Sequence, residues 1–308
     1  MAPNNIKYIW MNGELVEAEK ATVSFLASGL HYGLGVFEGI RAYNTDKGPA
    51  VFRLRDHMVR LLQSAHIMGF PKLPYSLDTL MAAVRETIRA NDLTDCYIRP
   101  HIYLNGDLPA LNIDRNSSHI GIAAWAWGTY LGEGALEKGV RANISSFTRH
   151  HANVMMTKAK TAGNYVNSAL AKTESIRAGY DEAILLDPQG FVAECTGENL
   201  LVVRKGKLYT TPTSSILEGI TRDSLLTLVN QMGYSVVEQL ISRDQLYIAD
   251  EVFVCGTAAE IVAVNEIDGR AIGTGSMGPI TRLIQQAFFS ALRGKHPLSA
   301  GWLDYVNP

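Results

Sequence analysis

Apolar residues recur at intervals of three and four positions in five stretches of the chain, which is typical of helices that pack one face against a core. The clearest case is residues 55–70, RDHMVRLLQSAHIMGF. Its apolar positions form one stripe, which consists of Met58, Leu61, Leu62, Ala65 and Met68. The same spacing predicts four more helices, which cover residues 77–91, 165–180 and 221–233 and a segment near the C-terminus.

Three of these helices carry specific expectations about their ends or faces. Gly179 should end the helix of residues 165–180, because glycine readily adopts the left-handed conformation. In residues 221–233, Thr221 is expected to be the N-cap and Gly233 to end the helix. The residues expected to face inward there are Leu225, Leu226 and Val229. The C-terminal helix has one apolar stripe, which consists of Ile280, Leu283, Ile284, Ala287, Phe288 and Leu292.

Residues 96–104, CYIRPHIYL, alternate with a period of two, which predicts a strand with two unlike faces. One face is apolar and consists of Cys96, Ile98, Ile102 and Leu104; the other consists of Tyr97, Arg99, His101 and Tyr103. The polar aromatic face is either a wall of a binding site or a face in contact with water. Further strands are predicted in residues 118–127 and 182–187, and hairpins should turn at Asn12–Gly13, Lys205–Gly206 and Asp268–Gly269.

Helices and strands mix in both halves of the chain without the regular alternation of a doubly wound sheet, which predicts the α+β class. A length of 308 residues suggests about two domains. Residues 128–139, GTYLGEGALEKG, are rich in glycine and poor in apolar residues, as junctions between domains often are. We therefore expect a smaller domain over residues 1–128, a linker over 129–136 and a larger domain over 137–308.

Composition and charge argue against several classes of protein. The net charge of −2 gives no electrostatic reason to bind nucleic acid or an anionic membrane. No apolar run approaches the roughly 20 residues that span a bilayer, and the N-terminus lacks the layout of a signal peptide. The cysteines Cys96, Cys195 and Cys255 form no CxxC pair, so neither disulfides nor a zinc cluster is expected. These features indicate a cytoplasmic protein.

Several familiar catalytic motifs are missing from the sequence. The glycines of residues 33–40, GLGVFEGI, have three residues after the second glycine where a dinucleotide-binding loop has two. The sequence has neither a GxxxxGK[ST] phosphate loop nor a GxSxG nucleophile elbow. His150 and His151 are adjacent and cannot share one face of a helix or strand, as metal ligands usually do. A nucleotide-binding dehydrogenase is therefore disfavoured, and no metal is expected.

Four features offer candidate chemistry, although each alone fits an ordinary structural role. Residues 158–165, KAKTAGNY, place two lysines beside small residues. Gly219–Thr221 lead into a helix whose first amides favour an anion, and Thr257–Ala258 form a second turn that exposes backbone amides. Glu194 and Glu198 flank a turn. Together, these features suit pyridoxal phosphate: a lysine forms a Schiff base, the amides hold the phosphate, and a carboxylate keeps the ring nitrogen protonated.

Twelve segments along nearly the whole chain stand in the order typical of one enzyme family. They are YIWMNGELV, LHYGLGVFEGIRAY, VFRLRDHMVRL, CYIRP, AAWAWGTYLG, KAKTAGNYVNS, DEAILLD, AECTGENL, LEGITRDS, YIADEVF, GTAAEI and GPITRLIQQAFF. In these segments the chain resembles the branched-chain amino acid aminotransferases, fold-type IV enzymes that depend on pyridoxal phosphate. The resemblance implies a small N-terminal α/β domain, a larger domain with a barrel-like sheet, and a coenzyme between them.

The resemblance implies a role for one of the two lysines: Lys160 matches the Schiff-base lysine, and Lys158 matches no functional position. Arg60 lies beside the apolar stripe of its helix and would pass for a solvated arginine by pattern alone. The other implied coenzyme-binding residues are Tyr165 at the ring hydroxyl, Glu194 at the ring nitrogen, Leu217 against the ring, and Arg60, Ile220, Thr221 and Thr257 at the phosphate.

The implied substrate pocket is aromatic. It consists of Phe37, Tyr97, Trp127, Tyr130 and Tyr165, with Tyr32 and Leu111 contributed by the other subunit. The amides of Thr257 and Ala258 would bind the α-carboxylate, and Arg99 the distal carboxylate of glutamate. The chain departs from the family's pattern at Cys195–Thr196, which replace a Gly-Ser or Gly-Thr pair. It also departs in the loop NGDLPALN, where Pro109 and Ala110 stiffen a normally glycine-rich segment.

The implied reaction exchanges an amino group between L-leucine, L-isoleucine or L-valine and 2-oxoglutarate, in amino-acid biosynthesis. Two alternatives share the fold, a D-amino acid aminotransferase and an aminodeoxychorismate lyase, but the segments YIRP and GTAAEI favour the branched-chain enzyme. Residues that reach across subunits imply a homodimer, which in this family can assemble further into a homohexamer.

Overall fold

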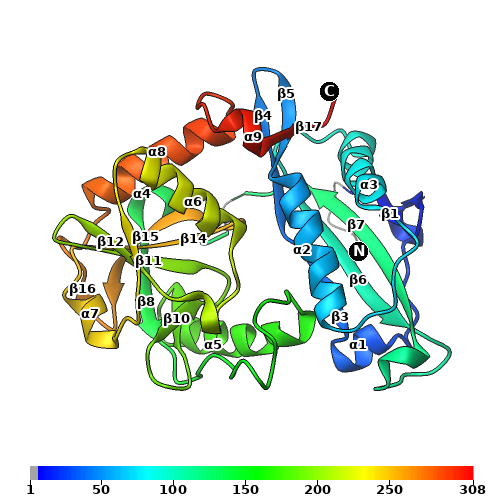
Figure 1. Ribbon diagram of the computed structural model, residues 1–308, viewed down its shortest axis with the longest axis horizontal. Coiled ribbons are helices and arrows are strands. Elements are labelled where there is room, and N and C mark those ends of the chain that lie inside the picture. Colours follow the sequence, from blue (N-terminus) through cyan, green and yellow to red (C-terminus); the bar gives the residue numbers. More distant parts are fainter. Residues whose placement is uncertain (1–5, 129, 133, 308) are drawn as a thin grey trace. The chain divides into compact units, whose positions relative to one another are not determined.

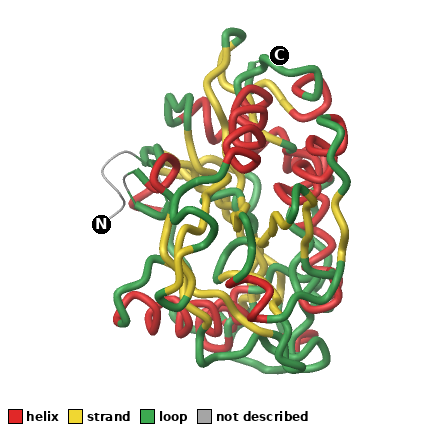
Figure 2. Tube along the Cα trace, turned by 90° about the vertical axis from the view of Figure 1, so that its left-hand side faces the viewer, coloured by secondary structure: helices red, strands yellow, loops and turns green. Residues whose placement is uncertain are grey.

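The computed structural model describes residues 6–128, 130–132 and 134–307 (Figure 1). These residues form two compact units. Of the described residues, unit 1 contains those within Met1–Gly128, Lys158–Gly163 and Ala291–Pro308, and unit 2 contains those within Thr129–Thr157 and Asn164–Ser290. Each unit combines helices with strands (Figure 2), which confirms the α+β class.

Unit 1 is built on an antiparallel sheet in the order β17-β5-β4-β6-β7-β1-β2, with β3 beside β6. The strands are β1 (Tyr8–Met11), β2 (Glu14–Glu17), β3 (Gly35–Phe37), β4 (Ile40–Thr45), β5 (Gly48–Phe52), β6 (Cys96–Asn105), β7 (Ser117–Trp125) and β17 (Leu303–Tyr305). The short helix α1 (Ser28–Tyr32) precedes β3, and α2 (Leu54–Ile67) and α3 (Leu77–Ala90) pack against the sheet (Figure 1).

The core of unit 1 confirms the two periodicities read from the sequence. Ile98, Ile102 and Leu104, on the apolar face of β6, are fully buried together with Met58 and Leu61 of α2. Burial of each such side chain stabilises the fold by roughly 1.5–3 kcal/mol. The opposite face of β6 is therefore left for polar and aromatic side chains.

Unit 2 contains a mixed, curled sheet in the order β10-β9-β8-β15-β14-β11-β12-β13, with β16 beside β15. Its strands are β8 (Val140–Ile144), β9 (Glu182–Leu186), β10 (Val192–Cys195), β11 (Asn199–Arg204), β12 (Lys207–Thr210), β13 (Val236–Glu238), β14 (Glu251–Gly256), β15 (Glu260–Ile267) and β16 (Arg270–Ala271). Its helices are α4 (Ala135–Lys138), α5 (Tyr165–Arg177), α6 (Ile220–Gln231), α7 (Arg243–Tyr247) and most of α8 (Pro279–Leu292). The curled sheet is the barrel-like sheet expected of the second domain.

The predicted domain boundary at residue 128 coincides with a unit boundary, but two segments assigned to the second domain belong to unit 1. The first contains Lys160, whose carbonyl accepts a hydrogen bond from the Phe37 amide at 3.0 Å. The second contains β17, which pairs with β5. These backbone pairings join residues far apart in sequence, which a boundary drawn from composition does not register.

Two details of the predicted helices are wrong. The N-cap of α6 is Gly219 and not Thr221, so the helix begins two residues earlier than expected. In α8 (Pro279–Leu292), Leu283 is 49% exposed, whereas Ile284 and Phe288 are buried, so the apolar stripe is narrower than expected. Among the described residues, none of the helices is long and apolar enough to cross a bilayer.

Candidate active site

The predicted site residues divide between the two units. Unit 1 carries Tyr32, Phe37, Arg60, Tyr97, Arg99, Leu111, Trp127 and Lys160, and unit 2 carries Tyr130, Tyr165, Glu194, Leu217, Ile220, Thr221, Thr257 and Ala258.

Lys160 is anchored on both sides of its peptide unit. Its carbonyl accepts from the Phe37 amide, its own amide donates to the Ser64 hydroxyl at 3.0 Å, and Thr161 forms a β-bridge with Val36. The Lys160 amine lies over the Phe37 ring, 5.2 Å from its centroid. The backbone therefore directs this lysine to an aromatic side chain that was predicted to line the substrate pocket.

A second cluster of unit 1 surrounds Glu38, which lies between β3 and β4 and is fully buried. The Arg60 guanidinium contacts it twice, with Nε 2.6 Å from Oε1 and Nη2 2.9 Å from Oε2. His57 Nδ1 lies 2.8 Å from Oε2. Burial alone would raise the pKa of Glu38, but the charge of Arg60 and the contact with His57 outweigh it and hold that pKa well below its usual range.

Sequence reasoning selected Arg60 but missed Glu38, His57 and Ser64. The available signal was the spacing of His57, Arg60 and Ser64 at i, i+3 and i+7, which places three polar residues on one face of a helix. His57 and Ser64 are fully buried. Burial lowers the pKa of His57, so its ring is neutral and donates a hydrogen bond to Glu38.

Arg99 joins the Lys160 region to the aromatic residues of unit 1. Its guanidinium carbon lies 4.6 Å from the centroid of the Phe37 ring, and its Nη2 donates to the Tyr97 hydroxyl at 2.9 Å. The Tyr97 and Trp127 rings are 5.1 Å apart. Residue 39 must be glycine here, because a Cβ atom would collide with the Tyr97 hydroxyl. Phe37 therefore has the amine of Lys160 and the guanidinium of Arg99 beside its ring.

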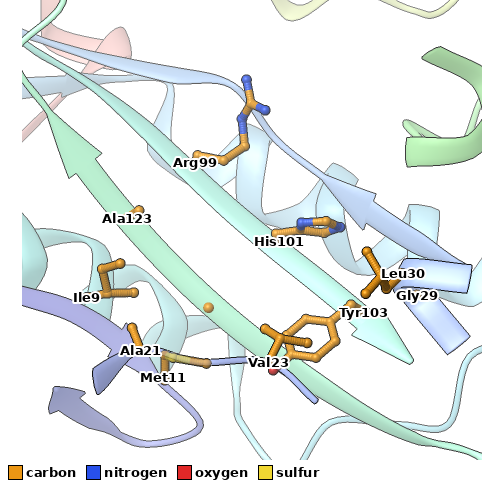
Figure 3. Close-up of a pocket in the computed structure, with 11 residues that line it drawn as sticks. Ile9, Met11, Ala21, Val23, Gly29, Leu30, Arg99, His101, Tyr103 and Ala123 are labelled. Carbon is orange, nitrogen blue, oxygen red and sulfur yellow. The ribbon is translucent and has the colours of Figure 1, made fainter. Parts of the chain in front are cut away.

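The polar face of β6 lines a cavity of about 430 Å³ (Figure 3). Arg99, His101 and Tyr103 follow one another along this strand, and the remaining lining residues are Ile9, Met11, Ala21, Val23, Gly29, Leu30, Gly121 and Ala123. Burial lowers the pKa of His101 to about 4, so its ring is neutral at physiological pH. This face of β6 therefore borders a cavity, and of the predicted site residues only Arg99 lines it.

In unit 2, Glu194 is 5% exposed and is held by groups on both carboxylate oxygens. Oε1 lies 2.8 Å from Nε of Arg149, which is 7% exposed. Oε2 accepts from the Leu217 amide and from the side-chain amide of Asn199, both at 3.3 Å. Arg149 was missed by sequence reasoning, because nothing in its local pattern distinguishes it. This ion pair makes Glu194 suitable as an anionic partner for a protonated ring nitrogen.

Glu198, the other candidate carboxylate, has a different environment. Burial raises the pKa of Glu198 to about 8, and the nearby charge of Glu182 adds to the rise. Glu182 is itself paired with Lys172 at 2.6 Å and accepts from the Thr196 hydroxyl at 2.6 Å. Glu198 is therefore mostly uncharged at neutral pH and unsuited to stabilise a pyridinium. The contact with Glu182 also gives a structural role to Thr196, the second residue of the pair that departs from the family's pattern.

Two backbone segments of unit 2 can receive anions. No side chain caps α6 at Gly219, so the amides of its first residues, Ile220 and Thr221, are available to a ligand. Thr257 and Ala258 lie in the turn that joins β14 to β15. Of the other predicted residues, Tyr165 begins α5 and Leu217 precedes α6, and both are half-buried.

The residues predicted to act across subunits are on the surface of unit 1. Tyr32 is 45% exposed and Leu111 is 74% exposed. Tyr130 of unit 2 is also exposed, and its ring lies 5.5 Å from the Lys172 amine.

Comparison with known proteins shows which family the chain is similar to. The profile of the family described as amino-transferase class IV matches residues 35–267. The branched-chain-amino-acid aminotransferase of Pseudomonas aeruginosa is 48% identical over 299 residues, which are 97% of each chain. The crystal structure of the Escherichia coli branched-chain amino acid aminotransferase matches with a TM-score of 0.93 and 48% identity, over 98% of this chain and 100% of that one.

A second solved structure includes a coenzyme derivative. The branched-chain amino acid aminotransferase of T.th., complexed with N-(5'-phosphopyridoxyl)-L-glutamate, matches with a TM-score of 0.94 and 47% identity, over 98% of this chain and 99% of that one. These relatives match 97–98% of the chain, which includes both of its compact units. The chain therefore belongs to the class IV aminotransferases, which use pyridoxal phosphate to transfer amino groups.

Proposed function

We propose that this chain transfers the amino group of L-leucine, L-isoleucine or L-valine to 2-oxoglutarate, giving branched-chain 2-oxo acids and L-glutamate. The observation that carries the proposal is that the Phe37 ring contacts both the Lys160 amine and the Arg99 guanidinium. An apolar surface beside a reactive amine suits a branched-chain donor, and a cation at the same surface suits glutamate. The names of the relatives support the branched-chain assignment.

The proposed coenzyme-binding residues match the chemistry of pyridoxal phosphate, which supplies an electron sink when it is bound. Lys160 would hold the coenzyme covalently, and its amine would carry the proton that leaves the substrate α-carbon. Glu194, paired with Arg149, keeps a proton on the ring nitrogen. The remaining proposed contacts are Tyr165 at the ring hydroxyl, Leu217 against the ring, and Arg60, Ile220, Thr221 and Thr257 at the phosphate.

The proposed substrate contacts divide by the chemistry of the substrate. The α-carboxylate is common to all substrates and binds the amides of Thr257 and Ala258. Arg99 binds only the distal carboxylate of glutamate and 2-oxoglutarate. The apolar side chains contact the aromatic residues, which are Phe37, Tyr97, Trp127, Tyr130 and Tyr165, together with Tyr32 and Leu111 of a second subunit.

A panel of amino donors tests the proposed reaction. With 2-oxoglutarate as acceptor, L-leucine, L-isoleucine and L-valine should be converted, whereas D-alanine should not, and aminodeoxychorismate should not undergo elimination. Faster turnover of D-alanine or of aminodeoxychorismate would assign the chain to one of the alternatives.

The family resemblance also supports a cytoplasmic location and a role in biosynthesis. Cell fractionation would test the location, and the growth requirement of a deletion strain would test the role.

Arg99→Met should separate the two classes of substrate. An Arg–carboxylate contact in a dry pocket contributes about 3 kcal/mol, so the glutamate and 2-oxoglutarate half-reactions should lose roughly two orders of magnitude in kcat/KM. The leucine half-reaction should stay within about threefold, because methionine keeps most of the apolar volume. Single-turnover measurements of each half-reaction give these values. Equal losses for leucine and glutamate would mean that Arg99 binds a group common to all substrates.

We also propose that the active enzyme is a homodimer, which can assemble further into a homohexamer. The exposure of Tyr32 and Leu111 suits residues that complete the pocket of a second subunit. Specific activity should then fall on dilution below the dimer dissociation constant. Sedimentation at the assay concentration provides the test, since a fully active monomer is incompatible with a shared pocket.

A further inference from the structure

The carboxylate of Glu38 holds the guanidinium of Arg60 from one side. Both nitrogens on that side, Nε and Nη2, contact the two oxygens of the carboxylate at 2.6 and 2.9 Å. The Arg60 side chain is 13% exposed, and that of Glu38 is not exposed at all. In such a fork the guanidinium plane follows the carboxylate plane, so the orientation of Arg60 is set by Glu38.

Glu38 is itself fixed by neighbours on two sides. His57 donates from Nδ1 to Oε2, and the Glu38 amide donates to the Pro100 carbonyl of β6 at 2.9 Å. His57 and Arg60 lie one turn apart on α2, and Ser64 of the next turn binds the backbone of Lys160. One face of α2 thus carries, in order, a support for Glu38, a cation and an anchor for the lysine segment.

We propose that Glu38 is a positioning residue for the phosphate group of the coenzyme: its carboxylate, supported by His57, sets the guanidinium of Arg60 in the orientation that receives the phosphate. The inference rests on the assignment of Arg60 to the phosphate under the proposed function. Neither Glu38 nor His57 needs to contact the coenzyme for this role. Both act through Arg60.

Two physical effects of Glu38 on an anion at Arg60 have opposite signs. Pre-orienting a long side chain avoids an ordering cost of about 0.5–1.5 kcal/mol on binding, so it favours the phosphate by up to about tenfold. The negative charge of Glu38 offsets part of the positive charge of Arg60 and disfavours the phosphate. Removing the carboxylate charge therefore weakens phosphate binding if positioning dominates and strengthens it if charge competition dominates.

The test compares two ligands that differ only in the phosphate. Dissociation constants of pyridoxal phosphate and of pyridoxal are measured by equilibrium dialysis on the full chain freed of coenzyme. The change in the ratio of the two constants between variants isolates the phosphate contribution, because the hemiacetal that free pyridoxal forms with its own aldehyde is the same for every variant. Glu38→Gln should reduce the preference for pyridoxal phosphate by about tenfold. Arg60→Met should reduce it by roughly a hundredfold, and the double variant should lose no more than Arg60→Met alone.

Asp304→Asn is the matched control. Asp304 forms a similar fork with Arg85 in the same unit, at 2.6 and 2.8 Å. Within the described part of the chain, Asp304 has no hydrogen bond or ion pair with a proposed site residue. It should lower the melting temperature and leave the preference for pyridoxal phosphate unchanged. If Asp304→Asn reduced the preference as much as Glu38→Gln, the effect would be one of general stability, and the proposal would fail.

Other outcomes separate this inference from the proposed function. An unchanged or stronger preference in Glu38→Gln, with the expected loss in Arg60→Met, overturns the positioning role and leaves the phosphate assignment intact. An unchanged preference in Arg60→Met overturns the phosphate assignment itself. If Glu38→Gln does not fold, Glu38→Asp keeps the charge but withdraws the carboxylate by one methylene. Positioning then predicts a weaker preference for pyridoxal phosphate, whereas charge competition predicts no change.

Discussion

Lys160→Ala should lower kcat by at least about three orders of magnitude, because the covalent attachment of the coenzyme and the proton carrier are lost together. Steady-state rates with L-leucine and 2-oxoglutarate measure the loss. Lys158→Ala is a close control, since Lys158 is two residues away and is half-buried like Lys160. It should retain most of the activity.

The position of the covalent bond gives a second measurement of the same prediction. Borohydride reduction of the enzyme followed by peptide mapping should find the coenzyme on Lys160. An adduct on Lys158, or full activity of Lys160→Ala, would contradict the assignment. The structure favours Lys160, because its amine lies over the Phe37 ring and its backbone is bound to Phe37 and Ser64.

Glu194→Gln should lower kcat by about two to three orders of magnitude with a much smaller change in KM. The neutral amide cannot stabilise a protonated ring nitrogen, and loss of one pre-oriented electrostatic partner commonly has an effect of this size. The variant also leaves Arg149 without its anionic partner. Rates at saturating and limiting leucine separate kcat from KM, and a change confined to KM would show that Glu194 serves substrate binding instead.

Glu198→Gln is the control for this variant and has an expected effect of its own on stability. The pKa of Glu198 in the folded protein, about 8, lies above the value of 4.5 for an ordinary glutamate. Between these pH values the folded protein holds a proton that the unfolded chain has lost, so stability contributed by this group falls as pH rises. As the pH rises from 4.5 to about 8, the melting temperature of the wild type should therefore decrease relative to that of Glu198→Gln. The kcat of Glu198→Gln should stay close to the wild-type value at neutral pH. If Glu198→Gln lost activity and Glu194→Gln changed only stability, Glu198 and not Glu194 would be the partner of the ring nitrogen.

Local patterns in the sequence were sufficient for most of the elements. The apolar stripe of α2, the alternation in β6 and the turn at Asn12–Gly13 all lie where expected. Each depends on the backbone period or on the conformation of one or two residues, which the local sequence specifies. The family and its coenzyme were also recognisable, because many short segments stand in one order.

Errors arose where a distant residue determined the outcome. The N-cap of α6 is Gly219, two residues before the predicted cap, and the side chain of the distant Asn199 lies where a Cβ atom at position 219 would be. The segment with Lys160 joined unit 1 through pairing with Phe37 and Val36. Neither of these long-range contacts can be predicted from the spacing of apolar and polar residues nearby in the sequence.

The sequence by itself determined the helices and strands, the family, and the residue types available for its chemistry. Only the tertiary structure decided which side chains are charged and how each charged side chain is oriented. Glu194 and Glu198 are four positions apart in one short segment, yet the first is paired with Arg149 and the second is mostly protonated. Arg60 lies on a predicted helix, yet its orientation depends on Glu38 from another element. Protonation and orientation follow from burial and from charges brought close by folding, and no local pattern encodes them.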